Sequence, residues 1–280
     1  MSLRERLRAR PEADDPFARH APDSHPGVKD RERAAASAST DGERLAGLQE
    51  RLYAEKTRMI LLVLQGIDTS GKDGTIKHVI GQMNPLGCRI TSFQKPTEEE
   101  ARHHFLWRIR RSLPEPGEIG VFGRSHYEDV IVPRVQGTLS DSEIDKRYAE
   151  IARFETGLAA GATTIVKCFL HISFEEQRRR LLARLDNPDK RWKFDPGDLD
   201  ARDLWPQYQD TFRDVVRRSS SDVAPWYVVP ADRKWYRNWA VGRLLLETLT
   251  EMAPEYPQAD LDIPALKARL AARPSLRAVE

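Results

Sequence analysis

Short apolar runs alternate with amphipathic segments along most of the chain. Residues 59–64, MILLVL, form a continuous apolar run, which is typical of a buried parallel strand. Later apolar or alternating runs predict further strands at 89–93, 118–122, 163–170 and 226–229. Helical patterns separate these runs, and strands that alternate with helices form parallel sheets through right-handed crossovers. The pattern predicts an α/β fold of three layers, with helices on both faces of a five-stranded parallel sheet.

Polar residues at the starts of the helical patterns predict where several helices begin. The expected starts are Asp41, Thr97, Ser125, Ser140 and Ser173. Thr97 forms a capping box with the Glu three residues later, and its helix is expected to run through 105–109. The helix after Ser173 is very basic and is expected to end near residue 186, and the last long helix is expected at 232–252.

Three stretches lack a sustained core pattern. Residues 1–40 are rich in Arg, Asp, Pro, Ala and Ser, which indicates an N-terminal arm that is loose or wraps the domain. Residues 187–222 turn polar and basic, and we expect a mobile insert there rather than core. The tail at 254–280 is Pro- and Arg-rich, with one short amphipathic piece at 266–270. The main domain is therefore predicted at 41–253.

Residues 66–72, Gly-Ile-Asp-Thr-Ser-Gly-Lys, join the first strand to a helical pattern and fit the phosphate-loop motif Gly-x-x-x-x-Gly-Lys. The two glycines permit backbone angles that turn successive amide N–H groups toward an anion, and the helix N-terminus adds its dipole. The alternative is a glycine turn that fits the motif by chance. The lysine at the motif spacing after a hydrophobic strand makes this alternative weaker. The residues predicted to bind phosphate here are Gly66, Gly71, Lys72, Asp73, Gly74 and Thr75.

One residue of this loop departs from the common motif. Asp73 stands where a Ser or Thr hydroxyl normally ligates Mg²⁺. Asp68, inside the loop, is the candidate replacement, since a hard cation prefers carboxylate oxygen. The alternative for Asp68 is an ordinary turn carboxylate that caps a backbone amide.

Bulk composition narrows the classes of protein further. The chain has 280 residues and a formal net charge of +2, so a polyanion site must be a local concentration of cations, and no nucleic-acid partner is expected. Its two cysteines, Cys88 and Cys168, are too few for a disulfide framework. No apolar run approaches a membrane span and no signal region opens the chain, so we expect a cytoplasmic protein with no membrane partner. The histidines lack zinc-ligand spacing.

Six segments in order are similar to the second family of polyphosphate kinases, over about 52–252. They are Gly-Ile-Asp-Thr-Ser-Gly-Lys-Asp-Gly-Thr at 66–75, Phe-Leu-Trp-Arg at 105–108, Arg-Ser-His-Tyr-Glu-Asp at 124–129, Arg-Trp-Lys-Phe at 191–194, Ala-Pro-Trp-Tyr-Val-Val-Pro-Ala-Asp at 224–232 and Lys-Trp-Tyr-Arg-Asn at 234–238. The resemblance implies a P-loop kinase fold with a helical lid. It also implies reversible phosphoryl transfer between inorganic polyphosphate and nucleotides, with Mg²⁺, or Mn²⁺ in its place, as cofactor. The sequence His-Tyr-Glu-Asp at 126–129 is similar to that of the subgroup that accepts both AMP and ADP.

The same resemblance implies roles for single residues. Asp68 would hold the metal, and Lys72 and Arg124 would grip the phosphates, these three forming the catalytic set. Members of the family usually carry Asp or Asn just before the Arg-Ser pair, where this chain has Gly123. The acids at 128 and 129 are the candidates to compensate. Family members commonly form homo-oligomers, so a dimer or tetramer is expected.

Polyphosphate is a chain of anions, so its path should be lined by basic residues. Beyond the loop, the candidates are Lys77, Lys95, Arg134, Arg184 and Lys193, and the alternative for each is a solvated surface charge. The cluster at 178–180 is expected to be a solvated helix face, and Trp107, Trp205 and Trp226 are expected to pack rather than stack on a base.

The competing functions are an ATP-dependent P-loop kinase for a nucleotide or metabolite, and a non-catalytic binder, which Gly123 alone suggests. GMP and GDP are further candidate substrates.

Overall fold

The computed structural model describes residues 1–272. Within them, five strands form one parallel sheet in the order β2-β3-β1-β4-β5. The strands are β1 (Met59–Gln65), β2 (Cys88–Ser92), β3 (Ile119–Gly123), β4 (Thr163–His171) and β5 (Trp226–Pro230). The predicted α/β fold with a five-stranded parallel sheet is therefore confirmed, and each strand lies within one residue of its expected bounds.

Burial explains the positions of the strands in the sheet. The central strand β1 is apolar on both faces, and from Ile60 to Leu64 its side chains are almost wholly inaccessible. The edge strand β2 alternates half-buried and exposed residues, as expected for a strand with only one neighbour. The continuous apolar run thus marked the strand that both helical layers cover.

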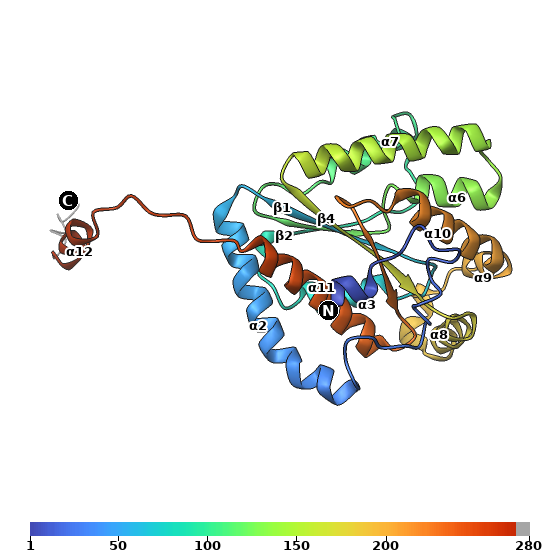
Figure 1. The fold of residues 1–280 in the computed structure, drawn as a ribbon, viewed down its shortest axis with the longest axis horizontal. Helices are drawn as coiled ribbons and strands as arrows, with labels where there is room; N and C mark the ends of the chain where they lie inside the picture. Colours follow the sequence, from blue (N-terminus) through green and yellow to red (C-terminus); the bar gives the residue numbers. More distant parts are fainter. Residues whose placement is uncertain (273–280) are drawn as a thin grey trace, which may run out of the picture.

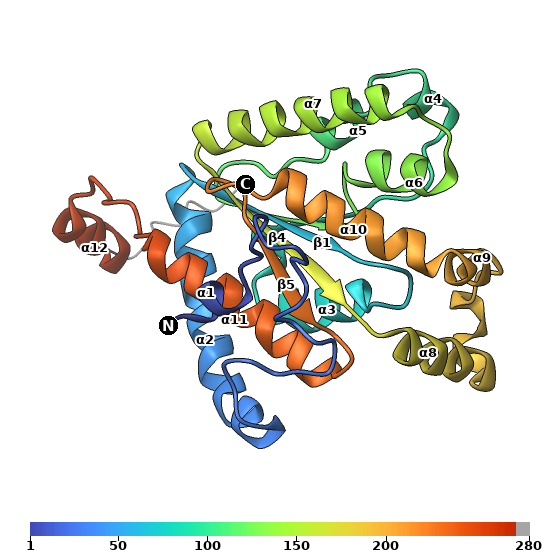
Figure 2. The same ribbon diagram turned by 45° about the vertical axis from the view of Figure 1, so that its right-hand side comes forward.

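Helices cover both faces of the sheet, as Figures 1 and 2 show. On one face lie α1 (Leu3–Leu7), α2 (Arg31–Glu55), α3 (Lys72–Ile80) and α11 (Lys234–Met252). On the other lie α5 (Leu106–Arg111), α6 (Glu128–Gln136), α7 (Asp141–Ala160) and α10 (Trp205–Ser219), with α4 (Glu98–Ala101) beside them. Beyond the carboxyl end of β4 lie α8 (Phe174–Asp186), η2 (Pro188–Lys193) and α9 (Gly197–Asp203), while η1 (Pro85–Gly87) precedes β2.

The N-terminal segment wraps the domain and is not loose. Leu3, Leu7 and Phe17 are buried in the main core, and Phe17 stacks on Phe169 of β4 at 4.7 Å between ring centroids. The helix expected to start at Asp41 instead starts at Arg31. Alanines and serines between these positions extend the helix without adding an apolar stripe, so the hydrophobic pattern did not mark its first turns.

Two further helix predictions need correction. The helix predicted after Thr97 is two short ones, because α4 ends at Ala101 and α5 begins only at Leu106, although the predicted capping box is present. Ser125 does not cap α6, which begins at Glu128; its hydroxyl accepts the Tyr127 N–H at 3.2 Å. The predicted starts at Ser140 and Ser173 are confirmed by side-chain caps.

The predicted insert is partly core. Phe212, Val215 and Val216 of α10 are buried in the same apolar cluster as the sheet, so the second half of 187–222 is not a mobile cover. The short helix of the tail, α12 (Ile263–Ala271), is exposed throughout and projects away from the domain (Figure 1), while residues 273–280 of the predicted tail lie outside the described part. No helix of residues 1–272 is long and apolar enough to cross a membrane.

Candidate active site at the phosphate loop

The loop between β1 and α3 needs its two motif glycines. Gly66 has φ +150°, and a Cβ there would lie 2.9 Å from the carbonyl oxygen of Leu170. Gly71 has φ +103°, and a Cβ there would overlap Nη1 of Arg237. Both positions therefore combine a backbone angle that side chains resist with a neighbour that leaves no space for one. This close packing is the shape expected of a loop that presents amides to an anion.

Two buried arginines support the loop from behind. Arg180 of α8 donates to the carbonyl oxygens of Thr69 (2.8 Å) and Ser70 (3.0 Å), and Arg237 of α11 donates to Ser70 at 3.3 Å. The expectation that Arg180 belongs to a solvated face is therefore wrong, because its guanidinium is buried and also pairs with Glu176 at 2.6 Å. By engaging the carbonyls, these two residues leave the loop's N–H groups for the opposite side.

Three charged side chains meet at the mouth of the loop. Nη2 of Arg124 lies 2.5 Å from Oδ1 of Asp68, and Nζ of Lys72 lies 4.0 Å from the same oxygen. Lys72 also donates to the carbonyl of Gly66 at 2.6 Å, so it spans the loop. Arg124 has φ +64°, a left-handed conformation that is uncommon for a residue other than glycine and that clusters at functional sites.

The environment favours the charged forms of Asp68 and Arg124, whereas burial lowers the pKa of Lys72. Burial raises the pKa of Asp68, but the charges of Lys72 and Arg124 outweigh it and hold that pKa below its usual value. Burial lowers the pKa of Arg124, but the combined attraction of Asp68 and Glu128 outweighs it and holds that pKa above its usual value. The mouth of the loop therefore combines fixed cations with one fixed carboxylate.

Two hydroxyls of the loop are unpaired within the described residues. Thr69 Oγ1 and Ser70 Oγ are buried and have no hydrogen-bond partner there. Buried hydroxyls normally find a partner, so an acceptor from a ligand would satisfy them. Phosphate oxygens fit this role and also suit Lys72 and Arg124.

A half-buried carboxylate lies beside this group. Glu128, the first residue of α6, accepts a hydrogen bond from the amide of Gln65 at the end of β1, and burial raises its pKa. Asp129 is held elsewhere, with Arg108 at 3.5 Å and Arg147 at 3.9 Å. Glu128 and Asp68 therefore supply carboxylate oxygens that suit a hard divalent cation, although no group of three His, Cys, Asp or Glu residues comes together as a metal cluster in residues 1–272.

The basic residues predicted for the polyphosphate path are only partly brought together. Arg184 pairs with Asp198 of α9 at 3.1 Å and donates to the carbonyl of Lys193 at 3.0 Å. The charge of Arg184 contributes to the lowered pKa of Asp68, and burial and the charge of Asp68 raise the pKa of Asp198. These helices therefore face the phosphate loop. Lys193 itself is exposed, above the ring of its neighbour Trp192.

Within residues 1–272, none of the other predicted side chains makes a hydrogen bond or ion pair with Asp68, Lys72 or Arg124. Lys77 and Lys95 are exposed, and Arg134, at the far end of α6 from Glu128, is paired with Asp141. Asp73 and Gly74 are exposed on the first turn of α3. Thr75 is buried and its hydroxyl bonds the carbonyl of Gly71 at 3.1 Å, so that side chain serves the helix.

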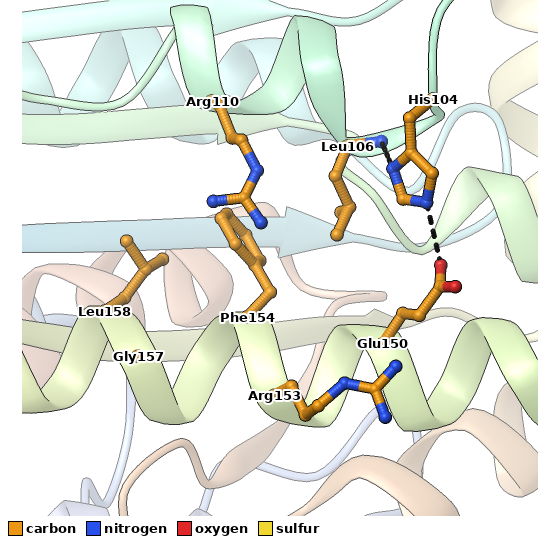
Figure 3. Close-up of a pocket in the computed structure, with 8 residues that line it drawn as sticks. All are labelled: His104, Leu106, Arg110, Glu150, Arg153, Phe154, Gly157 and Leu158. Atoms are coloured by element: carbon orange, nitrogen blue, oxygen red, sulfur yellow. Dashed lines mark hydrogen bonds and ion pairs between the residues drawn. The ribbon is translucent and has the colours of Figure 1, made fainter.

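A cavity of about 510 Å³ lies between α5 and α7, away from the phosphate loop (Figure 3). The Arg110 guanidinium lies over the ring of Phe154 at 5.0 Å, and His104 Nε2 lies 2.9 Å from Glu150. No residue of the phosphate loop lines this cavity, so its volume does not identify it as the reaction site.

The comparisons with known proteins agree with this geometry. Residues 28–257 match the family model described as Polyphosphate kinase 2 (PPK2). A Meiothermus ruber protein named AMP/ADP-polyphosphate phosphotransferase is 46% identical over 256 residues, which cover 91% of this chain and 96% of that protein. A Rhodopseudomonas palustris protein named ADP-polyphosphate phosphotransferase is 43% identical, covering 78% of this chain and 80% of that protein. The crystal structure of Polyphosphate Kinase 2 from Arthrobacter aurescens TC1 matches with a TM-score of 0.93 at 43% identity, covering 96% of each chain.

Proposed function

Because the chain belongs to the polyphosphate kinase 2 family, we propose that it catalyses reversible phosphoryl transfer between inorganic polyphosphate and the nucleotides AMP and ADP. The observation that carries the proposal is the Asp68–Arg124–Lys72 group at the mouth of a loop with two unpaired buried hydroxyls. Phosphoryl transfer needs positioning and charge neutralisation rather than covalent work by the protein, and this group supplies both.

Each residue of the site has a proposed role. The loop amides, Lys72 and Arg124 bind and orient the phosphoryl groups, and the hydroxyls of Thr69 and Ser70 donate to the same oxygens. Asp68, assisted by Glu128, would hold Mg²⁺ or Mn²⁺, since Mg²⁺ takes one or two carboxylates from a protein and completes its shell with phosphate and water. When bound, the cation neutralises charge on the phosphoryl oxygens. The Asp68 carboxylate also orients Arg124.

The helices after β4 are proposed to be the lid. Arg184 and Asp198 face the loop, and Lys193 lies on the same segment. Their closure over two anionic substrates would exclude water, which suppresses hydrolysis during transfer. The buried half of α10 belongs to the core, so the proposed moving part is confined to the segment before it.

The test is an assay of AMP, ADP, GMP and GDP with long-chain polyphosphate, with and without Mg²⁺ or Mn²⁺. We expect AMP and ADP to be phosphorylated without ATP, and EDTA to abolish the activity. Turnover only with ATP as donor would favour an ATP-dependent kinase. Binding of polyphosphate without turnover would favour a non-catalytic binder. The use of GMP and GDP, the homo-oligomer, the cytoplasmic location and the absence of a nucleic-acid partner stay predictions.

A further inference from the structure

A second group of polar side chains meets inside the protein, between β4, α7 and the loop that follows β3. Lys167 lies in the middle of β4, Glu155 on α7, and His126 and Tyr127 between Arg124 and α6. Lys167, His126 and Tyr127 are inaccessible to solvent and Glu155 is nearly so, at 3% exposed. No residue of this cluster belongs to the phosphate loop.

The cluster is joined by short hydrogen bonds. Lys167 Nζ lies 2.7 Å from Glu155 Oε2 and 2.8 Å from the Tyr127 hydroxyl, which itself donates to Glu155 Oε1 at 2.7 Å. His126 Nε2 lies 3.2 Å from the same Oε1, so its N–H donates to the carboxylate. Lys167 makes a third hydrogen bond, to the carbonyl oxygen of Ser219, the last residue of α10, at 2.8 Å.

The cluster neutralises its own charge. Burial raises the pKa of Glu155, but the attraction of Lys167 and the bond from His126 outweigh it and hold that pKa below its usual value. Burial raises the pKa of the Tyr127 phenol well above its usual value, so the hydroxyl remains a donor. Trp226 packs on the Tyr127 ring at 4.9 Å between centroids, which closes the cluster to water.

Tyr127 and His126 belong to the short stretch that carries the proposed phosphate ligand and its neighbouring carboxylate. Arg124 lies three residues before Tyr127 and Glu128 directly after it. The left-handed backbone of Arg124 persists only where its surroundings fix it. Gln65 fixes one side of the stretch, through Ser125 at 3.3 Å and through Glu128. The buried cluster fixes the other side.

Hydrogen bonds fix the orientation of a side chain, which apolar packing alone leaves free. Apolar contact is non-directional, whereas the bonds to the Tyr127 hydroxyl fix the orientation of the residue that carries it. A misplacement of about 1 Å at a reacting group costs about 10²-fold in rate. The buried Lys167–Glu155 pair therefore acts on the one segment where such precision changes the chemistry.

We propose that Lys167 and Glu155, through the Tyr127 hydroxyl, position Arg124 and Glu128 for phosphoryl transfer, an inference that rests on the proposed function. Tyr127, Lys167 and Glu155 are then positioning residues, because none of them touches the substrate. The cluster also holds the C-terminal end of α10, so the segment that carries Arg124 is tied to a core helix.

The test uses Tyr127→Phe, which removes the hydroxyl and keeps the ring packing. We expect kcat with AMP and polyphosphate to fall about tenfold or more, with little change in the KM for AMP, because the charges remain but are misplaced. Tyr236→Phe is the matched control, since Tyr236 is equally buried and its hydroxyl makes one bond, to the carbonyl of Pro26 at 2.8 Å. An unchanged kcat in Tyr127→Phe would overturn the proposal.

A double variant separates positioning from general stability. If Tyr127 acts through Arg124, Tyr127→Phe should lower kcat by no more than about twofold in an Arg124→Ala background, because coupled residues are not additive. A full tenfold loss there would overturn the proposal. His126→Asn, which removes the ring's bond to Glu155 together with its contacts with Phe154 and Tyr127, is the second variant should Tyr127→Phe fail to fold, and the same direction of effect is expected.

Hydrogen exchange keeps the test independent of the proposed reaction. In Tyr127→Phe we expect faster exchange of the amides of 124–128, with the amides of β1 unchanged. Unchanged exchange at 124–128 would overturn positioning, whichever donor the enzyme uses. Absence of polyphosphate-dependent turnover in the wild-type protein counts against the proposed function alone.

Discussion

Two ion pairs of nearly equal length lie in very different surroundings. Arg124 and Asp68 approach to 2.5 Å at the end of the sheet, with side chains 27% and 36% exposed. Lys167 and Glu155 approach to 2.7 Å inside it, with side chains 0% and 4% exposed. In the accessible pair, Arg124 can bind a phosphate and Asp68 a cation in place of each other. In the buried pair, Lys167 and Glu155 are out of reach of any ligand. The same chemistry therefore serves binding at one place and geometry at the other.

The difference also separates stability from activity. An exposed pair contributes about 0–1 kcal/mol to folding, because water screens it. Removing one partner of a buried pair costs about 3–5 kcal/mol, because the other charge is left without compensation. Since residues 124–128 touch both pairs, variants in each pair should fail in different ways.

Lys167→Met should have the largest effect on folding. It leaves the Glu155 carboxylate buried without the charge of Lys167, although Tyr127 and His126 still bond it, and we expect the free energy of unfolding to fall by about 3–5 kcal/mol. Urea unfolding followed by circular dichroism measures it. The double variant Lys167→Met with Glu155→Leu should recover part of the loss, because no charge remains unpaired. A loss below about 1 kcal/mol in the single variant would show that the pair is not held as the structure has it.

Asp68→Asn should have the largest effect on activity. The amide keeps the shape but loses the charge that orients Arg124 and that would hold the cation, so kcat should fall about 10²-fold or more. The free energy of unfolding should change by less than about 1 kcal/mol, since the pair is exposed. Kinetics over a Mg²⁺ titration, together with urea unfolding, measure both. Rates near those of the wild type at limiting Mg²⁺ would contradict the metal role.

The sequence predicted what is encoded locally. The strands follow from apolar runs, and the phosphate loop from two glycines and a lysine at fixed spacing. Arg180 was missed because three consecutive arginines look alike in composition. Helical phase separates them, since Arg180 lies three positions after the buried Gln177, on the same face of α8.

Partners distant in sequence could not be predicted in the same way. Lys167 is a single charge within the apolar run 163–170, which signals a buried partner, but nothing near it in sequence identifies Glu155. The core half of α10 was missed although Tyr208, Phe212 and Val215 recur at helical spacing, because the charged residues between them dominated the composition. Global packing, rather than local pattern, decides both cases.

Charges on the proposed lid should matter less than the pair at the loop. Arg184→Ala with Lys193→Ala should slow transfer by about tenfold, raise the KM for polyphosphate and flatten its salt dependence, because fewer cations meet the polyanion. Arg178→Ala with Arg179→Ala is the control, since it removes two charges from the exposed face of α8. Steady-state kinetics at two salt concentrations measure the effect. If the lid variant matches the control at both concentrations, these charges only keep the surface solvated.

The smallest effect is expected where the chain departs from the pattern of the family it resembles. Gly123, at the end of β3, is outside the left-handed region, so a side chain is compatible with its backbone. A Cβ there would lie 3.3 Å from Cδ1 of Ile76 and 3.4 Å from Oγ of Ser92, which requires a shift of a few tenths of an ångström. Because the first contact is the end of a flexible side chain, Gly123→Asp should fold.

Gly123→Asp should lower the Mg²⁺ concentration needed for half-maximal activity by about threefold, because a further carboxylate at the end of β3 adds negative charge and an oxygen ligand for a hard cation. Gly123→Ala is the matched control: it adds the same Cβ without the charge and should leave the Mg²⁺ requirement unchanged. Activity over a Mg²⁺ titration, with thermal unfolding as a check of folding, measures both variants. An equal Mg²⁺ requirement in the two folded variants would show that the end of β3 does not contribute to the metal site, and Asp68 would then share that role with Glu128 alone.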